Sequence, residues 1–244
     1  MGREMNNYNY SNAQDFYEGR AVVQYNHRYG AVDSQGNMII PNTYAVLGNF
    51  SEGKACAGGY NAWLGYVDKN NNEVIRPIFS GGGIFVNGFA EARDTTSTLW
   101  GFIDSYGTFK IPPLFVEATP FFEYLAAVKK NDKWGFIDTL GNFVVSPLYD
   151  DITGGFCENL AGVKSGDLWR FVDKTGAVII QPEFKGVDVF YCGLAMVLFS
   201  DNHIGYIDNL GNTIWKSPVQ SLQNTFLKNR KCEQVRRLMQ RIEI

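Results

Sequence analysis

Hydrophobic residues in this chain fall in short alternating runs that end at glycine, asparagine or proline, and the same run returns about every 35 residues. An aspartate that follows an apolar pair marks each return, with separations of 35, 36, 34, 35 and 35 residues. These aspartates are Asp33, Asp68, Asp104, Asp138, Asp173 and Asp208. A repeat of this length indicates tandem copies of one supersecondary unit, which we number copies one to six.

Two further positions recur ahead of each aspartate, and these two are always five residues apart. The first is an aromatic residue: Phe16, Phe50, Phe85, Phe121, Phe156 and Phe190. The second is an alanine: Ala21, Ala55, Ala90, Ala126, Ala161 and Ala195. The invariant alanine indicates a crowded position with room for only a methyl group.

Copy four shows the expected elements most clearly. Residues 125–129 and 134–138 are short, largely apolar runs on either side of the turn pair Asn131-Asp132, which predicts a β-hairpin. Asp138 and Gly141 then provide a second turn, since aspartate caps backbone N–H groups and glycine adopts positive φ. Residues 143–145 are expected to form a third strand that Pro147 ends, because proline has no N–H. The aromatic residue after it is expected to start a short fourth strand or a bend.

A glycine precedes the aspartate in five copies, and copy five has Arg170 instead. The glycines are Gly30, Gly65, Gly101, Gly135 and Gly205. We expect them where strand backbones or an aromatic ring approach closely. The distance from the alanine to this position varies between 9 and 11 residues, which predicts that the first hairpin ends in an exposed loop.

A unit this small cannot bury its own apolar face, so neighbouring copies must stack. The fold expected is an all-β repeat protein with six units arranged as a β-propeller, because closure removes exposed sheet edges. An open β-solenoid of hairpins is the alternative. We divide the chain into an N-terminal arm (1–15), the six-copy domain (16–218) and a basic amphipathic C-terminal α-helix (219–244). The helix is expected from the spacing of Leu222, Phe226, Val235, Leu238, Met239 and Ile242.

The copies resemble the bacterial WG-repeat family, whose unit carries a Lys-Trp-Gly-Phe/Tyr-Ile-Asp core, an Asn/Gly turn and a proline followed by an aromatic residue. The resemblance spans residues 16 to about 218 and is strongest at residues 121–150. Its tryptophan is present as Trp100, Trp134 and Trp169, whereas Tyr29, Leu64 and Ile204 replace it elsewhere. The resemblance implies a binding or scaffolding module and no shared enzymatic activity.

Composition and charge limit the cellular compartment and the class of ligand that can be expected. The four cysteines form no CxxC pair, and no apolar stretch is long enough for a signal peptide or a membrane span, so a cytoplasmic protein is expected. Residues 1–216 hold 16 basic and 23 acidic side chains, a net charge of −7, whereas residues 217–244 hold 6 and 2, a net charge of +4. Nucleic acid is an unlikely ligand for an acidic body.

The sequence offers no catalytic constellation. The two histidines, His27 and His203, fall in hairpin turns without cysteine or aspartate at ligand spacing, and Gly81-Gly82-Gly83 has no following lysine or helix to make a phosphate loop. The repeated aspartates are interpreted as turn caps and not as calcium ligands. No enzymatic activity, metal or cofactor is therefore expected. The Trp-Gly positions are interpreted as core residues.

Two departures from the repeat are the candidate binding residues. One is the hairpin loop with Tyr60, Asn61 and Trp63, together with Thr96 and Leu99 in the matching loop of the next copy. Aromatic residues flanked by glycine and asparagine are typical of protein-binding surfaces. The other is the apolar side of the C-terminal helix: Val235, Leu238, Met239 and Ile242. The function expected is a protein-interaction scaffold, such as an adaptor or an inhibitor subunit of a larger assembly; a carbohydrate or small-ligand module using exposed aromatics is the alternative.

Overall fold

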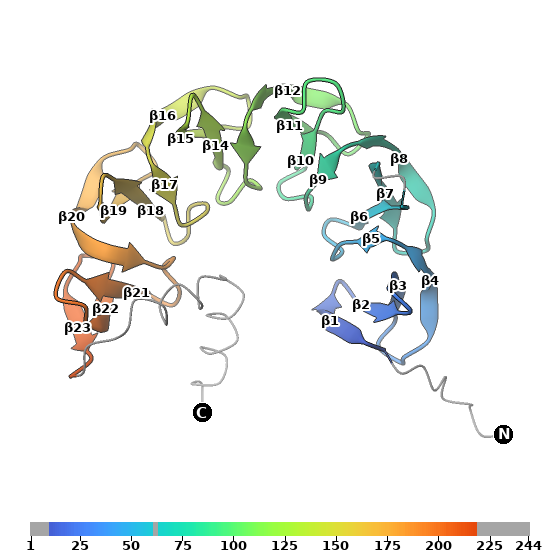
Figure 1. Ribbon diagram of the computed structural model, residues 1–244, viewed down its shortest axis with the longest axis horizontal. Coiled ribbons are helices and arrows are strands. Elements are labelled where there is room, and N and C mark those ends of the chain that lie inside the picture. Colours follow the sequence, from blue (N-terminus) through green and yellow to red (C-terminus); the bar gives the residue numbers. More distant parts are fainter. Residues whose placement is uncertain (1–9, 61–62, 219–244) are drawn as a thin grey trace. The chain divides into compact units, whose positions relative to one another are not determined.

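The computed structural model describes residues 10–60 and 63–218, and these residues are built from β-strands and turns (Figure 1). The expectations for residues 1–9, for Asn61 and for the C-terminal helix lie outside the described residues. Contacts divide the chain into two compact units, residues 1–120 and 121–244. No helix in the described part is long and apolar enough to cross a membrane.

The first unit contains three four-stranded antiparallel sheets in sequence order, one for each of copies one to three. Copy one forms β1 (Asn12–Tyr17), β2 (Arg20–Tyr25), β3 (Arg28–Val32) and β4 (Met38–Tyr44). Copy two forms β5 (Val46–Leu47), β6 (Lys54–Gly58), β7 (Leu64–Asp68) and β8 (Glu73–Phe79). Copy three forms β9 (Gly81–Gly82), β10 (Ala90–Arg93), β11 (Trp100–Ile103) and β12 (Phe109–Phe115), and β13 (Glu117–Ala118) follows.

The second unit repeats this order for copies four to six. Copy four contributes β14 (Ala126–Lys130), β15 (Lys133–Ile137) and β16 (Phe143–Tyr149). A seven-stranded sheet then runs through β17 (Asp151–Ile152), β18 (Leu160–Ser165), β19 (Leu168–Asp173), β20 (Val178–Val187), β21 (Leu194–Phe199), β22 (Ile204–Asp208) and β23 (Thr213–Lys216). Copies five and six share this sheet because β20 is long enough to pair with both β19 and β21.

The first hairpin of copy four confirms the expected turn. Asn131 and Asp132 have φ of 51° and 59°, and β14 pairs with β15 from Ala126↔Ile137 to Lys130↔Lys133. Two consecutive positive φ values match the right-handed twist of the flanking strands. The local residues therefore fix the register of this hairpin.

The expectation that Pro147 ends the third strand is wrong. β16 continues through Pro147 to Tyr149, and Trp134 pairs with Tyr149 while Phe136 pairs with Val145. Three residues, 146–148, therefore face the single residue Gly135 in a β-bulge. A proline in this bulge interrupts no ladder hydrogen bond, so the strand passes through it. The short strand after Tyr149 is β17, which begins the next sheet.

The six repeated aspartates cap turns, as the sequence predicts. Oδ1 of Asp138 accepts hydrogen bonds from the backbone N–H groups of Leu140 and Asn142, both at 2.9 Å. The Asn142 side-chain amide donates to Oδ2 at 3.2 Å, and Gly141 has φ of 86°. Asn71, which replaces this glycine in copy two, has φ of 69°. The carboxylate thus organises a five-residue turn between two strands.

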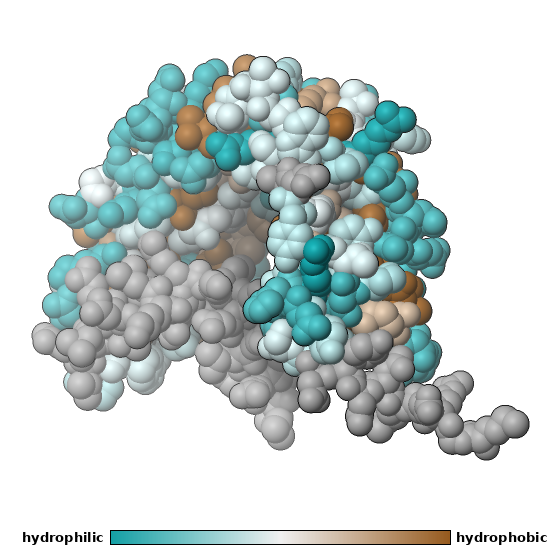
Figure 2. Space-filling view, turned by 45° about the vertical axis from the view of Figure 1, so that its right-hand side comes forward, coloured by the Kyte–Doolittle hydropathy of each residue, from teal (hydrophilic) through white to brown (hydrophobic). Residues whose placement is uncertain are grey.

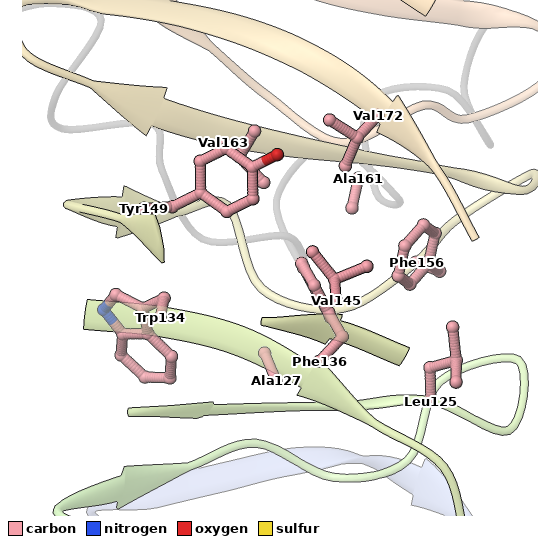
Figure 3. Close-up of a cluster of buried hydrophobic side chains, with 10 residues drawn as sticks. All are labelled: Leu125, Ala127, Trp134, Phe136, Val145, Tyr149, Phe156, Ala161, Val163 and Val172. Atoms are coloured by element: carbon pink, nitrogen blue, oxygen red, sulfur yellow. The ribbon is translucent and has the colours of Figure 1, made fainter. Parts of the chain in front are cut away.

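The core lies between consecutive sheets. In the second unit, one cluster joins Ala127, Phe136 and Val145 of copy four to Ala161 and Val163 of copy five (Figure 3). Figure 3 shows these side chains projecting into one space from the strands of the two copies. All six repeated alanines are 0–3% exposed. The alanine position is therefore the crowded contact between stacked sheets that its constancy predicts.

Glutamates link successive copies at a spacing of 35 or 36 residues. In the second unit, Glu123 accepts a hydrogen bond from the Asn159 N–H at 3.0 Å, and Glu158 accepts one from the Gly193 N–H at 2.9 Å. In the first unit the same rungs join Glu18 to Gly53 and Glu52 to Gly88. Each glutamate follows the repeated aromatic by two residues. We call these contacts the glutamate rungs.

Candidate functional site

The aromatic loop of copy two projects from the tip of the β6–β7 hairpin. Tyr60 is 64% exposed and Trp63 is 53% exposed, which is far more than a core aromatic residue. A Cβ on Gly58 would lie 2.6 Å from the Trp63 carbonyl oxygen, so only glycine permits the strands to close at this point. The hairpin therefore holds two large aromatic side chains outside the packed sheet.

Arg28 of copy one contacts this loop, which the sequence analysis did not anticipate. Its guanidinium carbon lies 4.0 Å from the centroid of the Tyr60 ring, within the range of a cation–π interaction. Its Nη1 donates to the Thr43 carbonyl oxygen at 2.7 Å, which orients the guanidinium. Arg28 directly follows the turn of the first hairpin in copy one. Stacking puts equivalent hairpin tips side by side, and this is the signal that could have identified it.

The matching loop of copy three is a capped turn. Oδ2 of Asp94 accepts hydrogen bonds from the backbone N–H groups of Ser97 at 2.6 Å and Thr96 at 3.0 Å. These bonds, those from Ser97 first, lower the pKa of the Asp94 carboxyl. Thr96 is exposed, and Leu99 is partly buried. This turn presents a fixed polar surface.

The described contacts of the copy-two loop are made with copy one. Among the interactions of the described loop residues, no hydrogen bond, ion pair or ring contact joins Tyr60 or Trp63 to Thr96 or Leu99. Tyr60 leans instead toward copy one, where Arg28 covers its ring. The described aromatic surface therefore consists of Arg28, Tyr60 and Trp63, which we call the aromatic tip.

A small cavity of about 140 Å³ lies beside the β6–β7 hairpin, and Gly58, Gly59, Tyr44 and Asn71 are among the residues that line it. The Tyr44 hydroxyl donates to Oδ1 of Asn71 at 2.8 Å, and burial raises the pKa of this hydroxyl. Pockets for drug-sized ligands usually measure roughly 300–1,000 Å³. This cavity has room for one side chain of a partner and not for a larger ligand.

The tryptophans at the Trp-Gly positions lie mainly in the core, as expected. Trp134 is 8% exposed and Trp169 is 1% exposed, whereas Trp100 is partly buried. Trp63 is outside the Trp-Gly pattern and is exposed. Figure 2 shows hydrophobic residues on the face in view as separate brown patches between hydrophilic ones. The tryptophans of the Trp-Gly positions therefore do not form a row of exposed aromatic platforms.

A buried acid is the main feature that the sequence analysis missed. Glu91 is 8% exposed, its Oε2 has no hydrogen-bond partner, and burial raises its pKa to about 8. Gly83 leaves the space that the Glu91 carboxyl occupies, since a Cβ there would overlap it. Burial also raises the pKa of the nearby Cys56 thiol to about 12. The glycine run 81–83 thus makes room for buried polar groups.

The described residues contain no group of three histidine, cysteine, aspartate or glutamate side chains arranged to hold a metal ion. Nδ1 of His203 lies 2.6 Å from the Ser217 carbonyl oxygen, and His27 sits in the turn of copy one with φ of 60°. The candidate residues Asn61, Val235, Leu238, Met239 and Ile242 lie outside the described part of the chain.

A family model described as "WG containing repeat" matches residues 29–57, 65–94, 100–134, 134–169 and 169–202. No curated protein is similar enough in sequence to match the chain.

Several solved structures share the fold. A eukaryotic initiation factor has a TM-score of 0.58 at 12% identity, over 86% of this chain and 66% of that one. The computationally designed protein Ika8 has a TM-score of 0.54 at 12% identity, over 85% and 74%. BamB from Moraxella catarrhalis has a TM-score of 0.53 at 13% identity, over 83% and 71%. At these identities the likeness shows only the fold, a propeller-like repeat of antiparallel sheets.

Proposed function

Since the chain belongs to the family of WG-containing repeat proteins, we propose that it is a non-catalytic scaffold that binds another protein, as an adaptor or an inhibitor subunit of a larger assembly. Stacked repeats of this kind offer extended surfaces for binding, and propeller-like repeats are typical of interaction scaffolds. The binding site must then come from residues that depart from the repeat.

The aromatic tip is the observation that carries this proposal. Tyrosine, tryptophan and arginine are the residues most enriched among those that dominate protein–protein binding energy. Here Tyr60 and Trp63 are more than half exposed, and Arg28 is already oriented over the Tyr60 ring. An ordered aromatic surface loses little side-chain entropy on binding. In this proposal Thr96 and Leu99 contribute a separate polar and apolar surface on copy three, and Asn61, which lies outside the described residues, remains a candidate.

A protein partner fits this surface better than a small ligand does. The cavity beside the aromatic tip measures about 140 Å³, and Trp134 and Trp169 are buried and unable to stack on a sugar. A protruding tip beside a one-residue cavity instead suits a partner surface that contributes a single side chain. Among the described cysteines Cys56, Cys157 and Cys192 no disulfide forms, which supports a cytoplasmic setting for this interaction.

The C-terminal segment is a second element of the proposed interface. Its net charge of +4 complements the net charge of −7 on residues 1–216. In this proposal Leu222 and Phe226 anchor the segment to copy six, while Val235, Leu238, Met239 and Ile242 face the partner. The double variant Leu238→Asp, Ile242→Asp then loses the partner and keeps its melting temperature. Unfolding of this variant, or binding equal to wild type, would contradict the division of roles.

Affinity capture from a native lysate tests the aromatic tip. The variant Tyr60→Ser, Trp63→Ser should lose a protein partner that the wild-type chain retains, because hot-spot truncations cost about 2 kcal/mol or more each. The matched control is Tyr106→Ser, since Tyr106 is 86% exposed on a turn of copy three and should not affect binding. Equal loss in both variants, or capture of a glycan in place of a protein, would overturn the proposal.

A further inference from the structure

A position that is buried in earlier copies is exposed in copy six. Trp215 on β23 is 50% exposed. Its equivalents in other copies lie on β4, β8, β16 and β20 and are 0–5% exposed: Ile40, Ile75, Val145 and Ile180. An exposed tryptophan at an otherwise buried core position indicates a surface that lacks its cover.

Neighbouring copies show what covers this position. A Cβ on Gly176 of copy five would lie 3.1 Å from Val145 Cγ2 of copy four, and one on Gly211 of copy six would lie 3.1 Å from Ile180 Cγ2 of copy five. The aspartate turn of each following copy therefore rests on this residue. In copy six, Leu194, Met196, Ile204 and Tyr206 around Trp215 are also only partly buried. We call these five residues the trailing face.

Copy one also exposes a residue that is buried in other copies, at a different position of the repeat. Phe16 is 54% exposed, although it belongs to the repeated phenylalanine position. Its equivalents Phe50, Phe85, Phe156 and Phe190 are 1–2% exposed. Phe16 and the exposed Ala13 on β1 form what we call the leading edge of copy one. The Phe16 side chain is therefore exposed at a position that the contacts between copies otherwise bury.

Three of the buried phenylalanines contact an aromatic ring of the preceding copy. The ring of Phe156 lies 4.7 Å from that of Phe136, and the ring of Phe190 lies 4.8 Å from that of Phe171. In the first unit, Phe85 lies 4.9 Å from Tyr66. The copy-six equivalent of Phe136, Phe171 and Tyr66 is Tyr206 on the trailing face. The two exposed surfaces are thus the two halves of an aromatic contact that the protein makes repeatedly.

We propose that the trailing face of copy six binds the leading edge of copy one in a second copy of this chain. Phe16 is seated against Tyr206, and the aspartate turn of copy one, whose Gly36 has no atom within 4 Å of a Cβ, covers Trp215. The contact is heterologous, since different surfaces of the two chains meet. Tyr10 and Met38 already pack on Ala21, Val23 and Val32 of copy one, so the contact centres on Phe16. A contact centred on one side chain buries a smaller area than a stable protein–protein interface does, so the association is weak and concentration-dependent. It uses none of the residues of the aromatic tip.

One interior feature is missing at this contact. Glutamate rungs join copies one, two, four and five to a backbone N–H in the next copy, whereas copy six has Cys192 at the glutamate position. The N–H at the matching position of copy one belongs to Gly19. The variant Cys192→Glu therefore supplies the rung, and it should tighten the association roughly three- to tenfold, as one added hydrogen bond does.

Sedimentation velocity of the full-length chain over a concentration series tests the proposal. The wild-type chain should associate, and Phe16→Asp and Trp215→Asp should each be monomeric at the same concentrations. Leu140→Asp is the control, because Leu140 is 81% exposed on a turn of copy four and lies on neither surface. Circular dichroism melting of all three variants distinguishes lost association from lost folding.

Mixing the two disabled chains provides the decisive measurement. The Phe16→Asp chain retains its trailing face and the Trp215→Asp chain retains its leading edge, so the mixture should form dimers and nothing larger. Wild-type chains that are monomeric at every concentration would overturn the proposal, and so would a mixture that stays monomeric. The proposal requires that Leu222 and Phe226 anchor to copy six outside the trailing face. Association that appears only after removal of residues 219–244 would therefore also overturn it, since that segment would then cover the trailing face.

Discussion

The Cα of Gly135 faces the carbonyl group of Val145 so closely that a Cβ would lie 2.6 Å from the carbonyl oxygen and 2.8 Å from the Pro147 nitrogen. The glycines at the equivalent sites meet the backbone of their own outer strand in the same way: Gly30, Gly65, Gly101 and Gly205. This confirms the close backbone approach predicted from the recurrence of glycine. The β-bulge opposite Gly135 brings the two strands together.

Gly135→Val should therefore be strongly destabilising. The backbone atoms around Gly135 cannot move aside without breaking the ladder between β15 and β16, so we expect a loss of about 2–3 kcal/mol or more. Urea denaturation measures this loss. Gly59→Val is the matched control, because no atom lies within 4 Å of a Cβ at Gly59. Lys133→Ala should also be nearly silent, since its ion pair with Asp150 is on the surface. A Gly135→Val chain that melts within a degree or two of wild type would refute this packing role.

The glutamate rungs predict a stability effect that no local contact would explain. Glu158→Ala removes the acceptor for the Gly193 N–H, 35 residues away, and should lower the free energy of unfolding by about 0.5–1.5 kcal/mol. Glu183→Ala serves as the control, because Glu183 is an exposed glutamate on β20. Faster hydrogen exchange at the Gly193 amide in the Glu158 variant alone would identify the broken bond. Equal stability of the two variants would show that the rungs contribute nothing.

The aspartate turns predict loss of stability in acid. Burial acts to raise the pKa of the Asp138 carboxyl, but hydrogen bonds from Asn142 and Leu140 outweigh it and hold the pKa below its ordinary value of 3.8. A depressed pKa gives stability that is present above the unfolded value and is lost as pH falls through the folded value. The urea concentration at the unfolding midpoint should thus decrease as the pH is lowered below about 4, and it should decrease less steeply in Asp138→Asn. Parallel acid profiles for both chains would contradict this assignment.

Glu91 predicts the opposite dependence of folding stability on pH. Its pKa is raised to about 8, so the folded chain holds a proton that the unfolded chain releases near the ordinary value of 4.5. Stability from this group is complete below the unfolded value and falls as pH rises toward the folded one, by at most about 1.4 kcal/mol per pH unit. Glu91→Gln, which carries no charge, should flatten the stability profile between these two values. A profile unchanged by the substitution would mean that Glu91 is ionised in the folded chain.

The local turns could be predicted because their contacts lie within a few residues. The carboxyl of Asp138 reaches the N–H groups of residues two and four positions later, so a short stretch of sequence specifies the whole turn. Asn131-Asp132 likewise fixes its hairpin through its own φ preferences. The period of these turns gave the number of copies and the family resemblance. The all-β, propeller-like class followed from them.

Contacts between residues far apart in the sequence, and strand pairings that depend on a bulge, could not be predicted in this way. Pro147 sits within a strand only because the bulge opposite Gly135 leaves no ladder bond for it to break. Arg28 reaches Tyr60, and Glu158 reaches Gly193, across about one repeat length of chain. Nothing in the residues next to each partner signals these pairs.

The sequence by itself determined the repeat, its turns and its small, crowded alanine positions, because each depends on local backbone geometry or on a pattern that six copies share. Tertiary structure alone decided which aromatic residues lie outside the core. Phe16 and Phe190 occupy the same place in the repeat, yet one is 54% exposed and the other 1%. The difference is whether a preceding copy packs against the ring, and burial between stacked sheets is a property of the neighbour and not of the residue.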